Sequence, residues 1–286
     1  MTQKRERVSI DEIGSGPIVF LYRNKIGRLL LKLLTLPAIS KIAGWLMDRK
    51  ISVVAIKSFI KKNNIDVSIY EEKKYKSYND FFTRKIKNSC RKIDMNPKSL
   101  ISPCDSKLSV YDISDDSIFK IKDSYYKVED LVKDKKLASK YKNGYCLIFR
   151  LCVDDYHRYC YIDNGKKTIN KFINGVLYTV RPVVLGNYNI YKENSREYTI
   201  LKTENFGDVV HVEVGATIVG RIKNHHEEYT FKKGEEKGMF EFGGSTIVLL
   251  IEKNRVTIDK EILDNTKQGY ETVVKYGEKI GNKRIK

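Results

Sequence analysis

The stretch Lys233–Ile251, KGEEKGMFEFGGSTIVLLI, sets two β-like segments on either side of a glycine turn. Its second segment, Ile247–Ile251, is a short apolar run of the kind found in buried strands. A Gly-Gly-Ser turn between strands is ordinary hairpin chemistry and by itself predicts no function. The turn is also the minimal substrate for self-cleavage, because the Ser245 hydroxyl can attack the Gly244 carbonyl with no side chain in the way.

Short β runs punctuated by Gly, Asn and Asp begin at about Ser99. The predicted strands are Lys107–Val110, Gly144–Leu151, Lys166–Leu177, Tyr198–Thr203, Val209–Val214, Ile247–Ile251 and Val256–Ile258, and Asp134–Lys140 is predicted as a short helix. The pattern predicts an α+β fold, with an N-terminal helical portion (residues 1–65) followed by a β-rich domain (residues 66–286).

The N-terminal portion carries apolar residues at helical spacing. Ile26–Met47 is predicted as two helical pieces flanking Pro37, with lysines and the single Trp45 among leucines. Such helices suit a membrane interface, and the alternative is packing against the protein itself or a dimer partner. Ile51–Ile60 is predicted as a core helix. In the segment Tyr78–Arg84, Asn79 is expected to cap a short helix while Phe81 and Phe82 are buried, a structural role.

The amino-acid composition is typical of a folded protein and indicates the charge of its partner. The 286 residues include 41% hydrophobic and 31% charged residues, which suits a packed core, and the net charge of +18 favours an anionic partner. We expect a membrane surface and no nucleic acid, because the lysines are scattered and no nucleic-acid motif is present. Five scattered cysteines without a CxxC pair indicate reduced thiols, and no metal site is expected. Neither a secretory signal nor a transmembrane helix is visible.

A serine nucleophile needs a base to take its proton, and the base needs an orienting group. His157 is the leading candidate for the base, since imidazole titrates near neutral pH. Asp105, in a Pro-Cys-Asp-Ser turn, is the candidate for the orienting carboxylate. The alternatives are a turn-capping role for Asp105 and a hydrogen-bonded core position for His157.

Five separated motifs give the chain a resemblance to phosphatidylserine decarboxylase proenzymes of the longer bacterial form. They are Tyr78–Arg84, Ser102–Ser106, Asp154–Arg158, Val214–Gly220 and Gly243–Thr246, in the order and spacing of that family. In the family, an aspartate at the second motif, a histidine and the motif serine act as a relay. The resemblance therefore implies that Asp105, His157 and Ser245 are catalytic.

The resemblance also implies a mechanism in two stages. Attack of Ser245 on Gly244 forms an ester, and elimination and hydrolysis leave a pyruvoyl group at position 245. The products would be a β chain, residues 1–244, and an α chain, residues 245–286, which stay together as one catalytic domain and could dimerise further. The pyruvoyl group would form a Schiff base with phosphatidylserine and accept the electrons left by CO2, with neither metal nor pyridoxal phosphate. The expected location is the cytoplasmic face of the cell membrane, as a peripheral protein.

The chain departs from the family pattern at two places. Many relatives carry a second histidine where this chain has Cys160, so His157 would serve both in the relay and in the later proton transfer. His211 is a distant second candidate for the base. Gly243 replaces a bulky residue, which loosens the turn without removing the cleavage chemistry.

A competing interpretation is a non-catalytic lipid-binding or carrier module, since the region Val214–Ile251 has the paired glycines of a small β-sandwich. Carrier modules of that type need a modifiable lysine in a tight hairpin, and the turn at Gly243–Thr246 has none. The sequence leaves open the acyl chains or other lipids accepted, the oligomeric state and the residues that bind the serine carboxylate. Arg158 and Arg196 are candidates for that last role.

Overall fold

A large antiparallel sheet dominates the computed structural model, which describes residues 4–10, 20, 24, 26–27, 37–121, 124–175, 193–215, 221–241, 243 and 245–285. The strands are β1 (Arg7–Ser9), β2 (Ser99–Ile101), β3 (Ser106–Asp112), β4 (Ile118–Ile121), β5 (Ser124–Lys127), β6 (Tyr145–Leu151), β7 (Arg158–Cys160), β8 (Gly165–Lys167), β9 (Lys171–Ile173), β10 (Arg196–Thr203), β11 (Gly207–Gly215), β12 (Ile222–Asn224), β13 (Tyr229–Phe231), β14 (Glu236–Phe240), β15 (Ser245–Ile251), β16 (Val256–Ile258), β17 (Tyr270–Val274) and β18 (Lys279–Lys283). The helices are α3 (Pro37–Met47), α4 (Val54–Lys62), α5 (Tyr78–Phe82), α6 (Val128–Val132), α7 (Lys135–Ser139) and α9 (Lys260–Lys267), with 3-10 turns η1 (Lys50–Val53), η2 (Val67–Ile69) and η3 (Asn88–Cys90).

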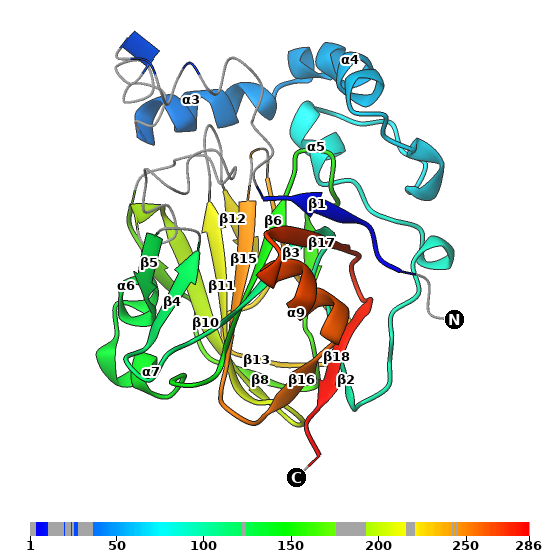
Figure 1. Cartoon of the computed structure of the whole chain (residues 1–286). Helices are drawn as coiled ribbons and strands as arrows, with labels where there is room; N and C mark the ends of the chain where they lie inside the picture. The colour runs from blue at the N-terminus through cyan, green and yellow to red at the C-terminus, as the bar shows by residue number, and fades with distance from the viewer. Residues whose placement is uncertain are drawn as a thin grey trace.

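The main sheet has the strand order β1-β17-β3-β6-β15-β11-β10-β8-β13, and β9 also pairs with β10 (Figure 1). Two small sheets, β12-β14-β7 and β16-β18-β2, and the hairpin β4-β5 complete the β structure of the described residues. The predicted predominance of β structure is confirmed. The predicted strands all appear with ends shifted by a few residues, except that Lys166–Leu177 forms two short strands, β8 and β9, and extends past residue 175 beyond the described part.

Strand β15 lies in the middle of the main sheet, between β6 and β11. All seven of its residues are buried because both faces of the sheet are covered. Ile247, Leu249 and Ile251 pack in the larger hydrophobic core, on the face toward β14 and β7. Val248 and Leu250 pack in the second core, beneath α6 and α7. The unbroken apolar run of this strand follows from burial on both faces.

The glycine turn, where self-cleavage is predicted, joins β14 to β15. Ser245 is the first residue of β15, where it pairs with Gly215 of β11 and Leu151 of β6. Gly243 has a φ of 139°, a backbone angle that side chains disfavour and glycine tolerates. Gly244 lies outside the described residues, so the structure describes only the Ser245 side of the predicted scissile bond.

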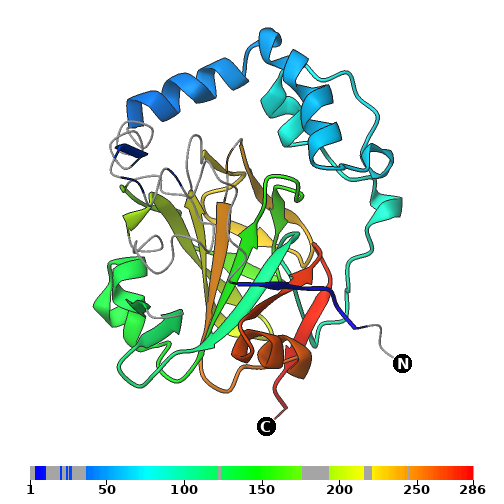
Figure 2. The same cartoon turned by 45° about the horizontal axis from the view of Figure 1, so that its top comes forward.

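Helices α3, α4 and α5 lie at the end of the main sheet where β6 ends and β15 begins (Figures 1 and 2). They have a small core of their own, formed by Ile56, Tyr78, Phe81 and Phe82. The expected burial of Phe81 and Phe82 is confirmed. No described helix has the length and apolar character needed to cross a membrane.

Three expectations for the N-terminal portion change, and a fourth lies largely outside the described residues. Ile51–Ile60 is not a core helix throughout, because only Ile56 on α4 is buried while Ile51 and Val54 are exposed. Asn79 does not cap α5. The Ser77 hydroxyl does so by accepting from the Asp80 amide, and Asn79 is buried and donates to Asp48. The apolar stretch between Ile26 and Pro37 lies largely outside the described residues.

The third change concerns the start of the chain, which is predicted to belong to the helical portion, residues 1–65. Strand β1 pairs with β17, so the start of the chain belongs to the β-rich domain and not to the helical portion. Arg5 explains this placement, because its guanidinium forms ion pairs with Asp259, Glu261 and Glu278. The predicted helix Asp134–Lys140 is confirmed as α7, with the Asp134 carboxylate accepting from the Leu137 amide.

Candidate active site

Ser245 is fully buried, and its hydroxyl has no hydrogen-bond partner among the described residues. A buried polar atom without a partner costs stability, so proteins keep such atoms rarely and often at sites of chemistry. Ser245 lies next to the glycine turn, at the end of the main sheet that faces helices α3, α4 and α5 (Figure 1). These features fit a residue held for reaction.

His157 is also fully buried, in the segment between β6 and β7. Its Nδ1 lies 2.8 Å from the carbonyl oxygen of Asp155. Because a carbonyl only accepts, Nδ1 carries the proton and Nε2 keeps its lone pair. Nε2 has no partner in the described part of the chain. Burial, together with the nearby cations Arg84 and Lys107, lowers the pKa of His157 to about 3, so the imidazole is neutral and its Nε2 is able to accept a proton.

The motif Tyr78–Arg84 supports the segment that carries His157. The Phe82 ring lies 4.1 Å from the imidazole, measured between ring centroids. Arg84 donates to the carbonyl oxygen of Asp154 at 3.2 Å, and Arg158 donates to the carbonyl oxygen of Thr83 at 2.8 Å. The motif Tyr78–Arg84 thus positions the candidate base, through contacts on both sides of His157.

Asp105 lies directly before β3 and is buried, but no hydrogen bond joins it to His157 among the described residues. It pairs with Arg91, accepts from the Tyr276 amide at 2.7 Å and lies 3.7 Å from the Lys275 ammonium. The group that orients His157 is instead the backbone of Asp155. The Asp155 carboxylate is itself held by the Lys107 ammonium at 2.8 Å and by the Cys152 amide at 2.7 Å.

Cys160, at the place of the second family histidine, is buried in β7. Burial raises the pKa of its thiol to about 12, so the group stays protonated at neutral pH. Its amide donates to the carbonyl oxygen of Pro103 at 2.9 Å. A protonated thiol is a poor base, and Cys160 therefore does not replace the missing histidine in that function.

His211 lies on β11, four residues from Gly215, the partner of Ser245. That separation corresponds to about 13 Å along a strand, too far for direct proton transfer. Arg196 and Arg158, the candidates for binding the substrate carboxylate, both use their guanidinium groups in hydrogen bonds within the protein. Arg196 donates to three backbone carbonyl oxygens, and Arg158 bonds to Thr83 and Glu236.

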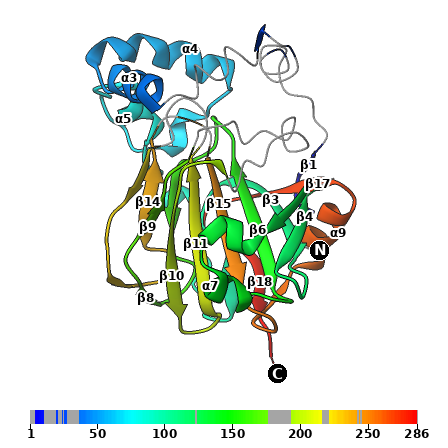
Figure 3. The same ribbon diagram turned by 90° about the vertical axis from the view of Figure 1, so that its left-hand side faces the viewer.

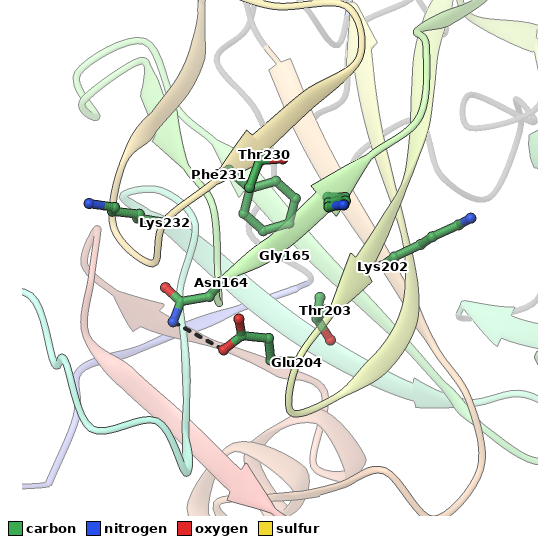
Figure 4. A pocket seen from close by; sticks show the side chains of 9 residues that line it. Asn164, Gly165, Lys202, Thr203, Glu204, Thr230, Phe231 and Lys232 are labelled. Carbon is green, nitrogen blue, oxygen red and sulfur yellow. Dashed lines mark hydrogen bonds between the residues drawn. The ribbon is translucent and has the colours of Figure 1, made fainter.

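A pocket of roughly 500 Å³ opens at the other end of the main sheet (Figure 4). Gly165, Thr203 and Phe231 line it, with a hydrogen bond between Asn164 and Glu204 at its edge. The eight residues of β11 between this end and Gly215 span about 26 Å, so the pocket is remote from Ser245. A smaller pocket of roughly 200 Å³ lies beside Asp105, with its partners Arg91 and Tyr276 in the lining.

Sequence reasoning missed three residues near the site. Asp155 was part of a recognised motif, but its action through a backbone carbonyl leaves no mark in the sequence. Glu213 and Lys237 form a fully buried ion pair on the side of the sheet that carries Ser245. An acidic residue between two buried valines, Val212 and Val214, was the available signal for that pair.

The comparisons with known proteins agree with one another. A family model described as phosphatidylserine decarboxylase matches residues 78–282. The chain is 52% identical over 268 residues to phosphatidylserine decarboxylase proenzyme 2 of Clostridium acetobutylicum, covering 93% of this chain and 92% of the relative. It is 46% identical to the proenzyme of Clostridium tetani, with 85% and 84% covered, and 42% identical to that of Desulfitobacterium hafniense, with 98% and 96% covered. The chain belongs to the phosphatidylserine decarboxylase family.

Proposed function

We propose that this chain cuts itself between Gly244 and Ser245 and then decarboxylates phosphatidylserine to phosphatidylethanolamine, with a pyruvoyl group made from Ser245. The observation that carries the proposal is the buried, unpartnered Ser245 hydroxyl beside the glycine turn, in a chain of this family. Residue 245 fits such a group, because its side chain is enclosed and has no hydrogen bond to lose among the described residues. When formed, the ketone supplies a sink for the electrons left by CO2.

His157 is the proposed base. Its neutral imidazole has a free lone pair on Nε2, fixed by the hydrogen bond of Nδ1 to the Asp155 carbonyl. In this proposal Nε2 takes the proton of the Ser245 hydroxyl during cleavage. It later returns a proton to the carbon that loses CO2. Asp105 remains a candidate for the relay, acting through the residues around it, since no direct contact with His157 supports it.

The two fragments are proposed to stay together as a heterodimer. The α fragment would contribute β15, which hydrogen-bonds to β6 and β11 of the β fragment on both sides. It would also contribute β17, which pairs with β3, and β18, which pairs with β2. Separation would expose the centre of the main sheet to water, and 42 residues (286 − 244) are too few for an independent core.

Intact mass and denaturing electrophoresis of the purified protein test the proposal. We expect two chains, corresponding to residues 1–244 and 245–286, with the smaller chain blocked to N-terminal sequencing. Release of CO2 from phosphatidylserine should accompany the split form. A single stable chain that binds lipid without turnover would instead support the carrier module, which the family membership does not favour.

The membrane surface is the proposed location of the reaction. The helices α3 and α4 and the turn between them expose large apolar side chains, including Trp45, Ile51 and Val54. Exposed cations accompany them, among them Arg49, which stacks on the Trp45 ring at 4.2 Å. Apolar side chains beside cations suit an anionic lipid surface. These helices lie at the Ser245 end of the sheet (Figure 3), which would bring the lipid headgroup to the site.

Replacing both Trp45 and Ile51 by glutamate is expected to weaken binding to phosphatidylglycerol-containing vesicles by about ten-fold or more, because each change removes apolar burial and adds repulsion. Vesicle co-sedimentation measures the effect. The double variant Met95→Glu/Ile285→Glu is the matched control, since both side chains are at least as exposed as Trp45 and lie outside α3 and α4. Equal binding by the Trp45→Glu/Ile51→Glu variant and the wild type would exclude this surface.

A further inference from the structure

A buried ion pair lies on the face of the sheet that carries Ser245. Ser245, Glu213 and His211 share the face of Ile247 and Leu249, because side chains alternate along strands and Glu213 pairs with Ile247. Gly215 pairs with Ser245, so Glu213 occupies the diagonal position, about 7–8 Å away between Cα atoms and within reach of a long side chain. Glu213 is fully buried.

The Glu213 carboxylate uses only one of its two oxygens. Oε1 accepts from the Lys237 ammonium and lies 2.8 Å from Nδ1 of His211. Oε2 is buried without a hydrogen-bond partner among the described residues. The Lys237 ammonium also donates to Asn224 at 2.6 Å, so the cation is held from two sides. The nearby cation lowers the pKa of Glu213 to about 2 despite burial, which keeps the carboxylate ionised.

An ionised buried oxygen without a donor is costly unless a ligand supplies the donor. The hydroxyl of Ser245 likewise has no hydrogen-bond partner among the described residues. Two buried polar atoms without partners, Glu213 Oε2 and Ser245 Oγ, therefore belong to diagonal positions on one face of the main sheet. A ligand that reaches residue 245 with a positively charged N–H group would satisfy the carboxylate. Phosphatidylserine and phosphatidylethanolamine both carry an ammonium group.

We propose that Glu213 binds the ammonium group of the lipid headgroup beside residue 245, with Lys237 holding the carboxylate in place. The inference rests on the proposed function, because it takes the lipid amine as the group that approaches this residue. Glu213 would be a substrate-binding residue, and Lys237 a positioning residue. Lys237 itself is not expected to bind the substrate carboxylate, because Glu213 and Asn224 already hold its ammonium.

The test compares Glu213→Gln with the double variant Glu213→Gln/Lys237→Gln. The single variant leaves the Lys237 ammonium buried beside a neutral amide, whereas the double variant removes both charges and keeps side chains of similar size. Glu271→Gln is the matched control. Glu271 is also buried and pairs with a cation, Arg150, but that arginine lies on the opposite face of the sheet.

We expect the double variant to split into two chains like the wild type, as measured by intact mass. Its KM for phosphatidylserine should rise about ten-fold or more, because a charge-assisted hydrogen bond is lost. Calorimetry should show that the split wild type prefers glycerophosphoethanolamine to the amine-free glycerophosphoglycerol by a similar factor, and that the variants lose this preference. Glu271→Gln should keep both the KM and the preference.

Unchanged KM and unchanged headgroup preference in the double variant would overturn the inference and leave the proposed function intact. Failure of both variants to split, with normal splitting of Glu271→Gln, would also overturn it, since Glu213 would then serve processing or the fold. Failure of the wild type itself to split would instead contradict the proposed function.

Discussion

Ser245→Ala is expected to yield one uncut chain of 33.2 kDa without decarboxylase activity. The substitution removes the only oxygen that can attack the Gly244 carbonyl from position 245, and with it the source of the pyruvoyl group. The fold should survive, because the Ser245 hydroxyl forms no hydrogen bond with the described residues and alanine keeps the strand buried. Intact mass gives the first result, and CO2 release from labelled phosphatidylserine gives the second.

Thr246→Ala is the matched control for this experiment. Thr246 is the next residue of β15, and it is also fully buried with a hydroxyl that has no described hydrogen-bond partner. Its side chain points to the opposite face of the sheet. We expect this variant to split and to decarboxylate. A Ser245→Ala protein that still splits, or that stays whole and retains turnover, would contradict the role of residue 245.

The strands around the site could be predicted because their signals are local. The apolar run of β15 and the valine alternation of β11 depend on burial of one or both faces, which the order of residues shows directly. The helix α7 could be predicted for the same reason, since its cap Asp134 lies three residues from the amide it accepts from. Ser245 was identified from a glycine turn in its own immediate neighbourhood.

Interactions between distant residues escaped prediction. Arg5 brings β1 into the sheet through carboxylates more than 250 residues away, which no local pattern indicates. The Lys237–Glu213 pair joins strands of two different sheets. Asp105 and Asp155 show a second limit of prediction from sequence, which concerns the contacts of residues inside a motif. Both lie in recognised motifs, but the sequence does not say that Asp155 contacts His157 through its main chain while Asp105 faces Arg91.

His157→Ala is expected to slow self-cleavage by about a hundred-fold or more, the usual contribution of a positioned general base. The Nε2 atom of this neutral, buried imidazole carries a lone pair without a hydrogen-bond partner among the described residues. The thiol of Cys160 stays protonated and therefore does not replace His157 as the base. Because the pKa of His157 is about 3, its proton-accepting form should persist from about pH 8 to about pH 5, and the wild-type cleavage rate should not fall over that range through this group.

The alanine variant also leaves a cavity against the Phe82 ring, so His157→Phe is needed beside it to fill the space without a basic nitrogen. His226→Ala is the matched control, because that imidazole stacks on the Tyr229 ring, with 3.7 Å between ring centroids, and no described contact joins it to His157 or its two chain neighbours. The rate at which the uncut chain disappears, followed by electrophoresis after synthesis in a cell-free system, measures all three variants. Cleavage by both His157 variants at the wild-type rate would remove this residue from the processing step. Normal cleavage together with a loss of decarboxylation would assign His157 to the later proton transfer alone, because self-cleavage precedes decarboxylation at this site.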